Sequence, residues 1–191
     1  MEINRKIFII LVIYGFLLFF IGLFLNKIII WDEYFFLIIN GLSNPYLGLF
    51  FNLITYLGSS VFWIFLIVIF WLKNNRKLSL HLLFAFIIDS FFLVIFKWIF
   101  LRPRPLEVIE FDVGPSFPSG HSERVFSGAI VLSKYYKKYR ILFYTLATLV
   151  SFSRIYIGVH YPLDVIIGSI NGIIIGMIAL AIPTKRIEKR L

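Results

Sequence analysis

The 191 residues suffice for one domain, residues 1–191, but 60% of them are hydrophobic and 19% aromatic. Soluble domains contain roughly 45–50% apolar residues, so the composition excludes an ordinary soluble domain and favours lipid as solvent. The net charge of +9 does not indicate a nucleic-acid partner, because the Lys and Arg residues stand in short clusters between apolar runs.

Six apolar runs approach the ~20 residues with which a helix crosses roughly 30 Å of hydrocarbon. In chain order the predicted spans are residues 7–25, 54–72, 78–100, 122–136, 141–159 and 163–182. The first follows Arg5 and Lys6 like a signal peptide but lacks a small-residue cleavage site, so we interpret it as a retained anchor. The predicted fold class is all-α, an integral membrane six-helix bundle.

Two segments between the spans are distinctive. Residues 31–45 mix aromatic and acidic side chains, which is typical of a helix at the membrane interface, although a surface loop fits equally well. Residues 101–120 hold four of the seven prolines, and an irregular segment of that length usually carries function.

Basic residues in short loops predict the orientation, because they collect on the cytoplasmic side. One side of the predicted bundle holds 13 of the 19 Lys and Arg residues. The other six are Lys27, Lys97, Arg102, Arg104, Arg124 and Arg154. We therefore expect a multi-pass protein of the inner (cytoplasmic) membrane with both termini in the cytoplasm.

Three polar segments lie on the outer side, and folding of the bundle can bring them together. The cations Lys97, Arg104 and Arg154 suit a phosphate dianion. Each one alone is more typical of a side chain that extends to lipid headgroups.

The segment Pro118, Ser119, Gly120, His121 stands before a predicted helix, where free N–H groups favour an anion. An ordinary helix cap is the alternative. His121 strengthens the functional interpretation, because a histidine there can protonate a departing alkoxide.

His160 precedes Asp164 by four residues, with Pro162 starting a helix between them. A carboxylate one turn away can hold one imidazole nitrogen and leave the other nucleophilic. A metal site is disfavoured, because four nearby cations would repel a dication and the only further cluster of carboxylates is Glu107, Glu110 and Asp112 in the irregular loop.

Together these residues resemble the type 2 phosphatidic acid phosphatases, a superfamily that also includes vanadium haloperoxidases and glucose-6-phosphatase. The three signatures are Lys97, six residues, Arg104 and Pro105; then Pro118 to His121; then Ser153, Arg154, five residues, His160, three residues and Asp164. The resemblance implies His160 as nucleophile, Asp164 as its partner and His121 as general acid. It also implies that no metal or cofactor is needed, with phosphate bound by Lys97, Arg104, Ser119, Gly120 and Arg154.

Four charged residues fall outside these roles. Arg102 is predicted either to contact a lipid headgroup or to support the phosphate-binding residues from behind. Arg124 is predicted to contact a second polar group of the substrate, with a helix-internal or capping contact as the alternative. Glu123 is unusual at its position, and Asp89 in the third span is a buried acid without an assigned role.

The resulting hypothesis is a phosphohydrolase that acts at the outer face on a membrane lipid phosphate or pyrophosphate. Lipid A 1-phosphate, undecaprenyl pyrophosphate and phosphatidylglycerol phosphate are the expected substrates, and the lipid bilayer is the expected partner. The alternatives are a lipid-to-lipid phosphotransferase with the same site and a non-catalytic membrane transporter. Neither the physiological lipid nor the oligomeric state is predicted.

Overall fold

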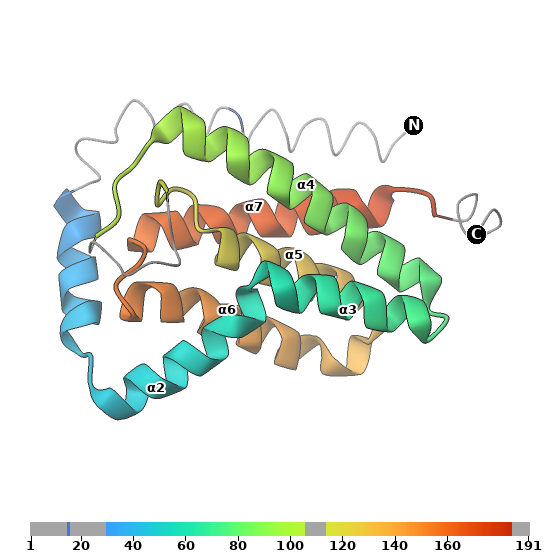
Figure 1. The fold of residues 1–191 in the computed structure, drawn as a ribbon, viewed down its shortest axis with the longest axis horizontal. Helices are drawn as coiled ribbons and strands as arrows, with labels where there is room; N and C mark the ends of the chain where they lie inside the picture. Colours follow the sequence, from blue (N-terminus) through green and yellow to red (C-terminus); the bar gives the residue numbers. More distant parts are fainter. Residues whose placement is uncertain (1–14, 16–29, 106–113, 185–191) are drawn as a thin grey trace.

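The computed structural model describes residues 15, 30–105 and 114–184, and every regular element in those ranges is a helix (Figure 1). A helix over Ile30–Gly41 is followed by α2 (Pro45–Ile54), the 3-10 turn η1 (Thr55–Gly58), α3 (Ser60–Leu72) and α4 (Arg76–Phe100). After the loop come α5 (Gly120–Tyr135), the 3-10 turn η2 (Lys137–Tyr139), α6 (Arg140–Tyr156) and α7 (Pro162–Ala181).

Five of the six predicted spans coincide with helices in this order, and the first, residues 7–25, lies outside the described residues. Helices α4 and α7, with 25 and 20 residues, are long and apolar enough to cross a membrane. Helices α3, α5 and α6 are shorter, with 13, 16 and 17 residues. The all-α class is therefore confirmed, while the number of spans stays a prediction.

Local signals explain where the helices begin. The side chains of Asn44, Ser59 and Ser119 accept hydrogen bonds from the first turns of α2, α3 and α5. Proline opens α2 and α7, where its missing N–H has no helical partner to lose. The helix starts that carry the polar motifs are thus specified locally.

The segment predicted as an interfacial helix or a loop is largely helical. Ile30–Gly41 meets the following Pro45–Gly58 at an angle of 114°. The Asn40 side-chain amide donates to the Tyr156 carbonyl at 3.0 Å, and the Tyr156 hydroxyl donates to the Leu42 carbonyl at 3.0 Å. These bonds hold the bend against the end of α6. Its location at the membrane interface stays a prediction.

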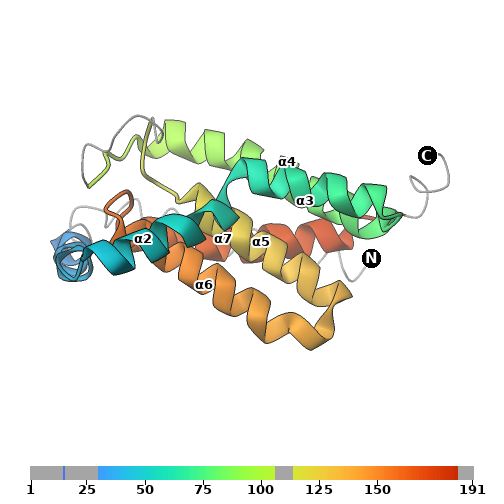
Figure 2. The ribbon, with the colours of Figure 1, turned by 60° about the horizontal axis from the view of Figure 1, so that its bottom comes forward.

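Helix α5 lies at the centre of the bundle, between α4, α6 and α7 (Figures 1 and 2). Its apolar side chains join the buried core, which includes Trp63, Leu82, Val125 and Val150. Two glycines of α7 let its backbone approach α5, because a Cβ at Gly168 or Gly172 would collide with backbone carbonyl oxygens.

The outer faces of the helices are apolar. Val61 and Phe65 of α3 are 77% and 59% exposed, and Phe91 and Trp98 of α4 are 62% and 73% exposed. Soluble monomers rarely expose apolar patches of this extent, whereas lipid tails cover them without cost. This surface, together with α4 and α7, identifies a membrane protein.

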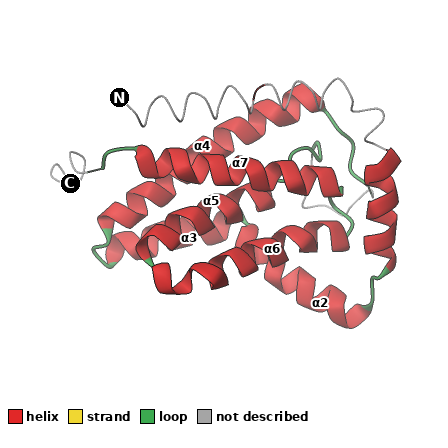
Figure 3. Cartoon of the chain, turned by 180° about the vertical axis from the view of Figure 1, so that it is seen from behind, coloured by secondary structure: helices red, strands yellow, loops and turns green. Residues whose placement is uncertain are grey.

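The three polar motifs lie at one end of the bundle, and the turns rich in Lys and Arg lie at the opposite end. The turns that join α3 to α4 and α5 to α6 share one end (Figures 1 and 3). The segments that follow α4 and α6, which carry the predicted site, share the other end.

Candidate active site

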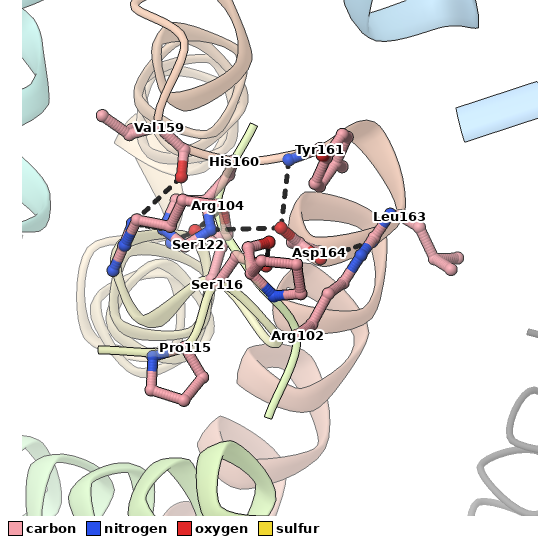
Figure 4. A network of polar contacts seen from close by, with 12 residues as sticks. Arg102, Arg104, Pro115, Ser116, Ser122, Val159, His160, Tyr161, Leu163 and Asp164 are labelled. Carbon is pink, nitrogen blue, oxygen red and sulfur yellow. Dashed lines mark hydrogen bonds and ion pairs between the residues drawn. The ribbon is translucent and has the colours of Figure 1, made fainter. Parts of the chain in front are cut away.

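His160 lies in the short connection between α6 and α7, at the polar end of the bundle, and is only 2% exposed. Its Nδ1 is 3.4 Å from Oδ2 of Asp164, which also accepts a hydrogen bond from the Tyr161 backbone N–H at 3.0 Å (Figure 4). Because Asp164 stands in the first turn of α7, the helix start fixes its position. One imidazole nitrogen is thus held by a carboxylate and Nε2 points elsewhere.

Burial keeps this imidazole neutral. The pKa of His160 is lowered to about 4 from the ordinary 6.5, chiefly by removal from water and to a smaller extent by the Arg154 and Arg104 charges. Asp164 acts in the opposite sense, because its hydrogen bond and negative charge favour the imidazolium. Loss of water outweighs the carboxylate, so the ring carries a free lone pair at neutral pH.

Arg104 approaches the other side of the ring. Its Nη1 is 3.4 Å from His160 Nε2 and donates to the Val159 carbonyl at 2.9 Å (Figure 4). Its Nε donates to the Gly114 carbonyl at 3.1 Å, and Lys97 Nζ donates to the neighbouring Pro115 carbonyl at 2.6 Å. The structure therefore brings both cations of the first motif to the loop before α5, and Arg104 directly to the histidine.

The second motif is bound to the third through the backbone. The Ser119 N–H donates to the Asp164 carbonyl at 3.0 Å, and Gly168 of α7 packs against the Ser119 backbone. The Ser119 side chain also caps α5, as its alternative interpretation predicted. Gly120 begins α5, so N–H groups of its first turn are available to an anion.

His121 stands in the first turn of α5, and its ring packs over Gly58 at the end of η1. A Cβ at Gly58 would lie 2.7 Å from His121 Cδ2 and 2.9 Å from Val150 Cγ1, so glycine leaves the room that the imidazole occupies. The predicted general acid is thus placed at the same end of the bundle as His160.

Arg154 is 3% exposed near the end of α6. Its Nη1 donates to the Thr55 hydroxyl at 2.9 Å, and its carbonyl accepts from the N–H groups of Val159 and His160, both at 3.1 Å. Arg154 therefore supports the turn that carries the histidine as well as bringing a cation to it.

Arg102 adopts the second of its two predicted roles, a contact that supports the site from behind. Its side chain is 7% exposed and bridges Asp164 Oδ1 at 2.7 Å and Asp32 Oδ2 at 2.6 Å. Both ends of the guanidinium fork are occupied by carboxylates, so the geometry favours this buried bridge over the alternative of a headgroup contact. The sequence analysis did not select Asp32, because it stands among aromatic residues 70 positions before Arg102.

Arg124 also turns inward. Its Nε lies 3.0 Å from Oδ2 of Asp89, an ion pair without hydrogen-bond alignment, and its side chain is 12% exposed. This contact gives Asp89 a partner and disfavours a headgroup role for Arg124. Glu123 is fully buried beside them.

Among the residues that the structure describes, no group of three or more His, Cys, Asp or Glu side chains could hold a metal ion. The three acids considered in the sequence, Glu107, Glu110 and Asp112, lie outside the described residues.

Several curated proteins are similar in sequence, among them two phosphatases. An undecaprenyl-diphosphatase from Sulfolobus acidocaldarius is 35% identical over 131 residues, which cover 62% of this chain and 64% of the relative. The match thus spans just under two thirds of that relative. A lipid A 4'-phosphatase from Porphyromonas gingivalis is 32% identical over 162 residues, covering 74% of this chain and 68% of the relative.

Solved structures also share the fold, among them two phosphatases. LpxE from Aquifex aeolicus aligns with a TM-score of 0.71 at 33% identity, covering 78% of this chain and 93% of that one. A PAP2 type phosphatidylglycerolphosphate phosphatase from Bacillus subtilis aligns with a TM-score of 0.74 at 26% identity, covering 100% and 98%. The PAP2 superfamily model matches residues 78–188, which is more than half of the chain. The resemblance inferred from the three motifs is confirmed, and the chain belongs to the PAP2 superfamily.

Proposed function

We propose that this protein is a metal-independent lipid phosphohydrolase that forms a phosphohistidine on His160. The observation that carries the proposal is the buried, neutral imidazole, held at Nδ1 by Asp164 and facing the Arg104 guanidinium at Nε2. A nucleophile needs a free lone pair and a fixed direction, and the guanidinium beside it can receive the phosphoryl oxygens.

The reaction proceeds in two displacements. His160 Nε2 attacks phosphorus, an N–P bond forms, and the P–O bond to the leaving group breaks while His121 supplies its proton. Water then attacks the phosphohistidine and gives a proton to His121, which releases inorganic phosphate and restores both histidines. The charge that develops on the imidazole is stabilised by Asp164, and the charge on the phosphoryl oxygens by Lys97, Arg104 and Arg154.

A lipid substrate is supported by an apolar groove beside the site. The groove encloses about 270 Å³ between α3, α5 and α6, and its lining includes Leu57, Trp63, Ala129, Ala147 and Val150. Leu57 and Val150 flank Gly58, on which the His121 ring packs. An apolar groove between the helices, with two lining residues next to the glycine on which His121 packs, suits a substrate whose apolar chain stays in the bilayer.

The names of the relatives point to the same substrate class. They include an undecaprenyl-diphosphatase, a lipid A 4'-phosphatase and a phosphatidylglycerolphosphate phosphatase. We therefore keep undecaprenyl pyrophosphate, lipid A 1-phosphate and phosphatidylglycerol phosphate as proposed substrates.

The proposed site faces outward from the inner membrane, with both termini in the cytoplasm. The support is the placement of Lys73, Arg76, Lys137, Lys138 and Arg140 at the turns opposite the site. Reporter fusions to the C-terminus test this orientation, and a signal from outside the membrane contradicts it.

The deciding experiment measures phosphate release by the purified protein in detergent with EDTA, on each of the three lipids. His160→Ala removes the nucleophile and is expected to lower kcat by at least about 10³-fold. His81→Gln is the matched control, because His81 bonds to Tyr135 and the Ile182 carbonyl at the end of the bundle away from the site. Undiminished hydrolysis by His160→Ala refutes the proposed chemistry.

A further inference from the structure

The nucleophile is the end of a buried chain of charged side chains that begins in the helix Ile30–Gly41. Asp32 contacts Arg102 at 2.6 Å, Arg102 contacts Asp164 at 2.7 Å, and Asp164 contacts His160 at 3.4 Å. Asp32 and Arg102 are 5% and 7% exposed, and both Asp164 and His160 are more deeply buried. Water therefore screens these contacts weakly.

Every oxygen of the two carboxylates has an assigned partner. Asp164 Oδ1 accepts a hydrogen bond from Arg102, and its Oδ2 accepts from the Tyr161 N–H and faces His160 Nδ1. Asp32 gives Oδ2 to Arg102 and Oδ1 to the N–H of Leu163, at 2.7 Å, in the first turn of α7. The Arg102 guanidinium also lies over the Tyr161 ring, 4.0 Å from its centre. The chain thus fixes both the carboxylate and the helix turn that presents it.

We propose that Asp32 and Arg102 are positioning residues that hold Asp164 in the orientation and the ionised form that His160 needs during attack on phosphorus. Arg102 stabilises the Asp164 carboxylate, so the proton on Nδ1 stays on the imidazole. Asp32 offsets the Arg102 charge, so Asp164 retains enough negative potential to stabilise the imidazole as it becomes cationic. This inference rests on the proposed role of His160.

A variant that removes the charge of Asp32 but keeps its size distinguishes a positioning role from a merely structural one. Asp32→Asn keeps the size of the side chain and an oxygen for the Leu163 N–H, but it removes the negative charge. Its matched control is Asp89→Asn, which neutralises another buried aspartate that faces an arginine, Arg124, but has no contact in the chain from Asp32 to His160.

The expected result for Asp32→Asn is a loss of kcat of about tenfold with KM changed less than about twofold, on the lipid that the wild type hydrolyses fastest. Orthovanadate resembles the transferring phosphoryl group, whereas inorganic phosphate resembles the ground state, so only vanadate inhibition should weaken by a similar factor. In the folded fraction of Asp89→Asn, kcat and the inhibition by vanadate should both equal those of the wild type.

A wild-type kcat for Asp32→Asn, or an equal loss in Asp89→Asn, overturns the inference. If Asp32→Asn elutes as an aggregate, Arg102→Lys is measured by the same criteria, since it keeps the charge but loses the two-pronged contact. A wild-type kcat in that variant also overturns it. His160→Ala distinguishes the two proposals, because activity without His160 refutes the proposed function whatever Asp32→Asn shows.

Discussion

The protonation of His160 provides a direct test of the site, because its pKa is lowered by burial to about 4. At pH 5.5 such an imidazole is about 3% protonated, whereas one with the ordinary pKa of 6.5 is about 91% protonated. The proposed nucleophile, His160, is therefore expected to stay neutral across the range in which ordinary histidines gain a proton.

Histidine-selective NMR of the protein in detergent measures this difference, since the chain has only three histidines. The His160 signal, assigned by its loss in His160→Ala, is expected to stay constant between pH 8 and 5.5. The same signal in SDS-unfolded protein should titrate near 6.5. A midpoint near 6.5 in the folded protein would refute the assignment of a buried, neutral nucleophile.

The same pKa difference links His160 to stability. The folded state disfavours the imidazolium, so the unfolded chain binds more protons between the two pKa values. The contribution of His160 to stability is fully present above about pH 6.5 and is lost as the pH falls toward about 4.

Two further predictions concern packing around the site. A Cβ at Gly168 would lie 2.5 Å from the Ser119 carbonyl oxygen, so Gly168→Ala should displace the second motif by up to ~1 Å and lower kcat/KM at least about tenfold. Gly48→Ala in α2 is the control, because nothing lies within 4 Å of its added Cβ, and equal activity of both variants would contradict the tight contact. Ala147→Trp fills the apolar groove and should lower kcat/KM on a long-chain lipid phosphate about tenfold, but leave a short-chain, water-soluble ester unaffected. Equal losses on both substrates would contradict a chain-binding role.

Much of the fold and the site follows from local sequence, because membrane helices need long apolar runs and their starts need caps or proline. The predicted ranges 78–100 and 163–182 correspond to α4 and α7 within two residues at either end. The sequence likewise predicts the contact of His160 with Asp164, since Pro162 starts a helix whose first turn carries Asp164 next to the preceding connection.

The tertiary structure decided the contacts between distant charged residues. Arg102 and Arg124 have the same chemistry as Arg104, and nothing in their neighbours indicates that Asp32 and Asp89 would bind them. Such pairs depend on which helix faces which, and that choice comes from close packing, including the glycines of α7 against α5. The sequence by itself determined the family, the class of chemistry and the local contact of His160 with Asp164. Only the packed bundle determined that Arg102 links Asp164 to Asp32, a carboxylate 132 positions earlier in the chain. The reason is that the partners of buried charges depend on the packing of the whole fold.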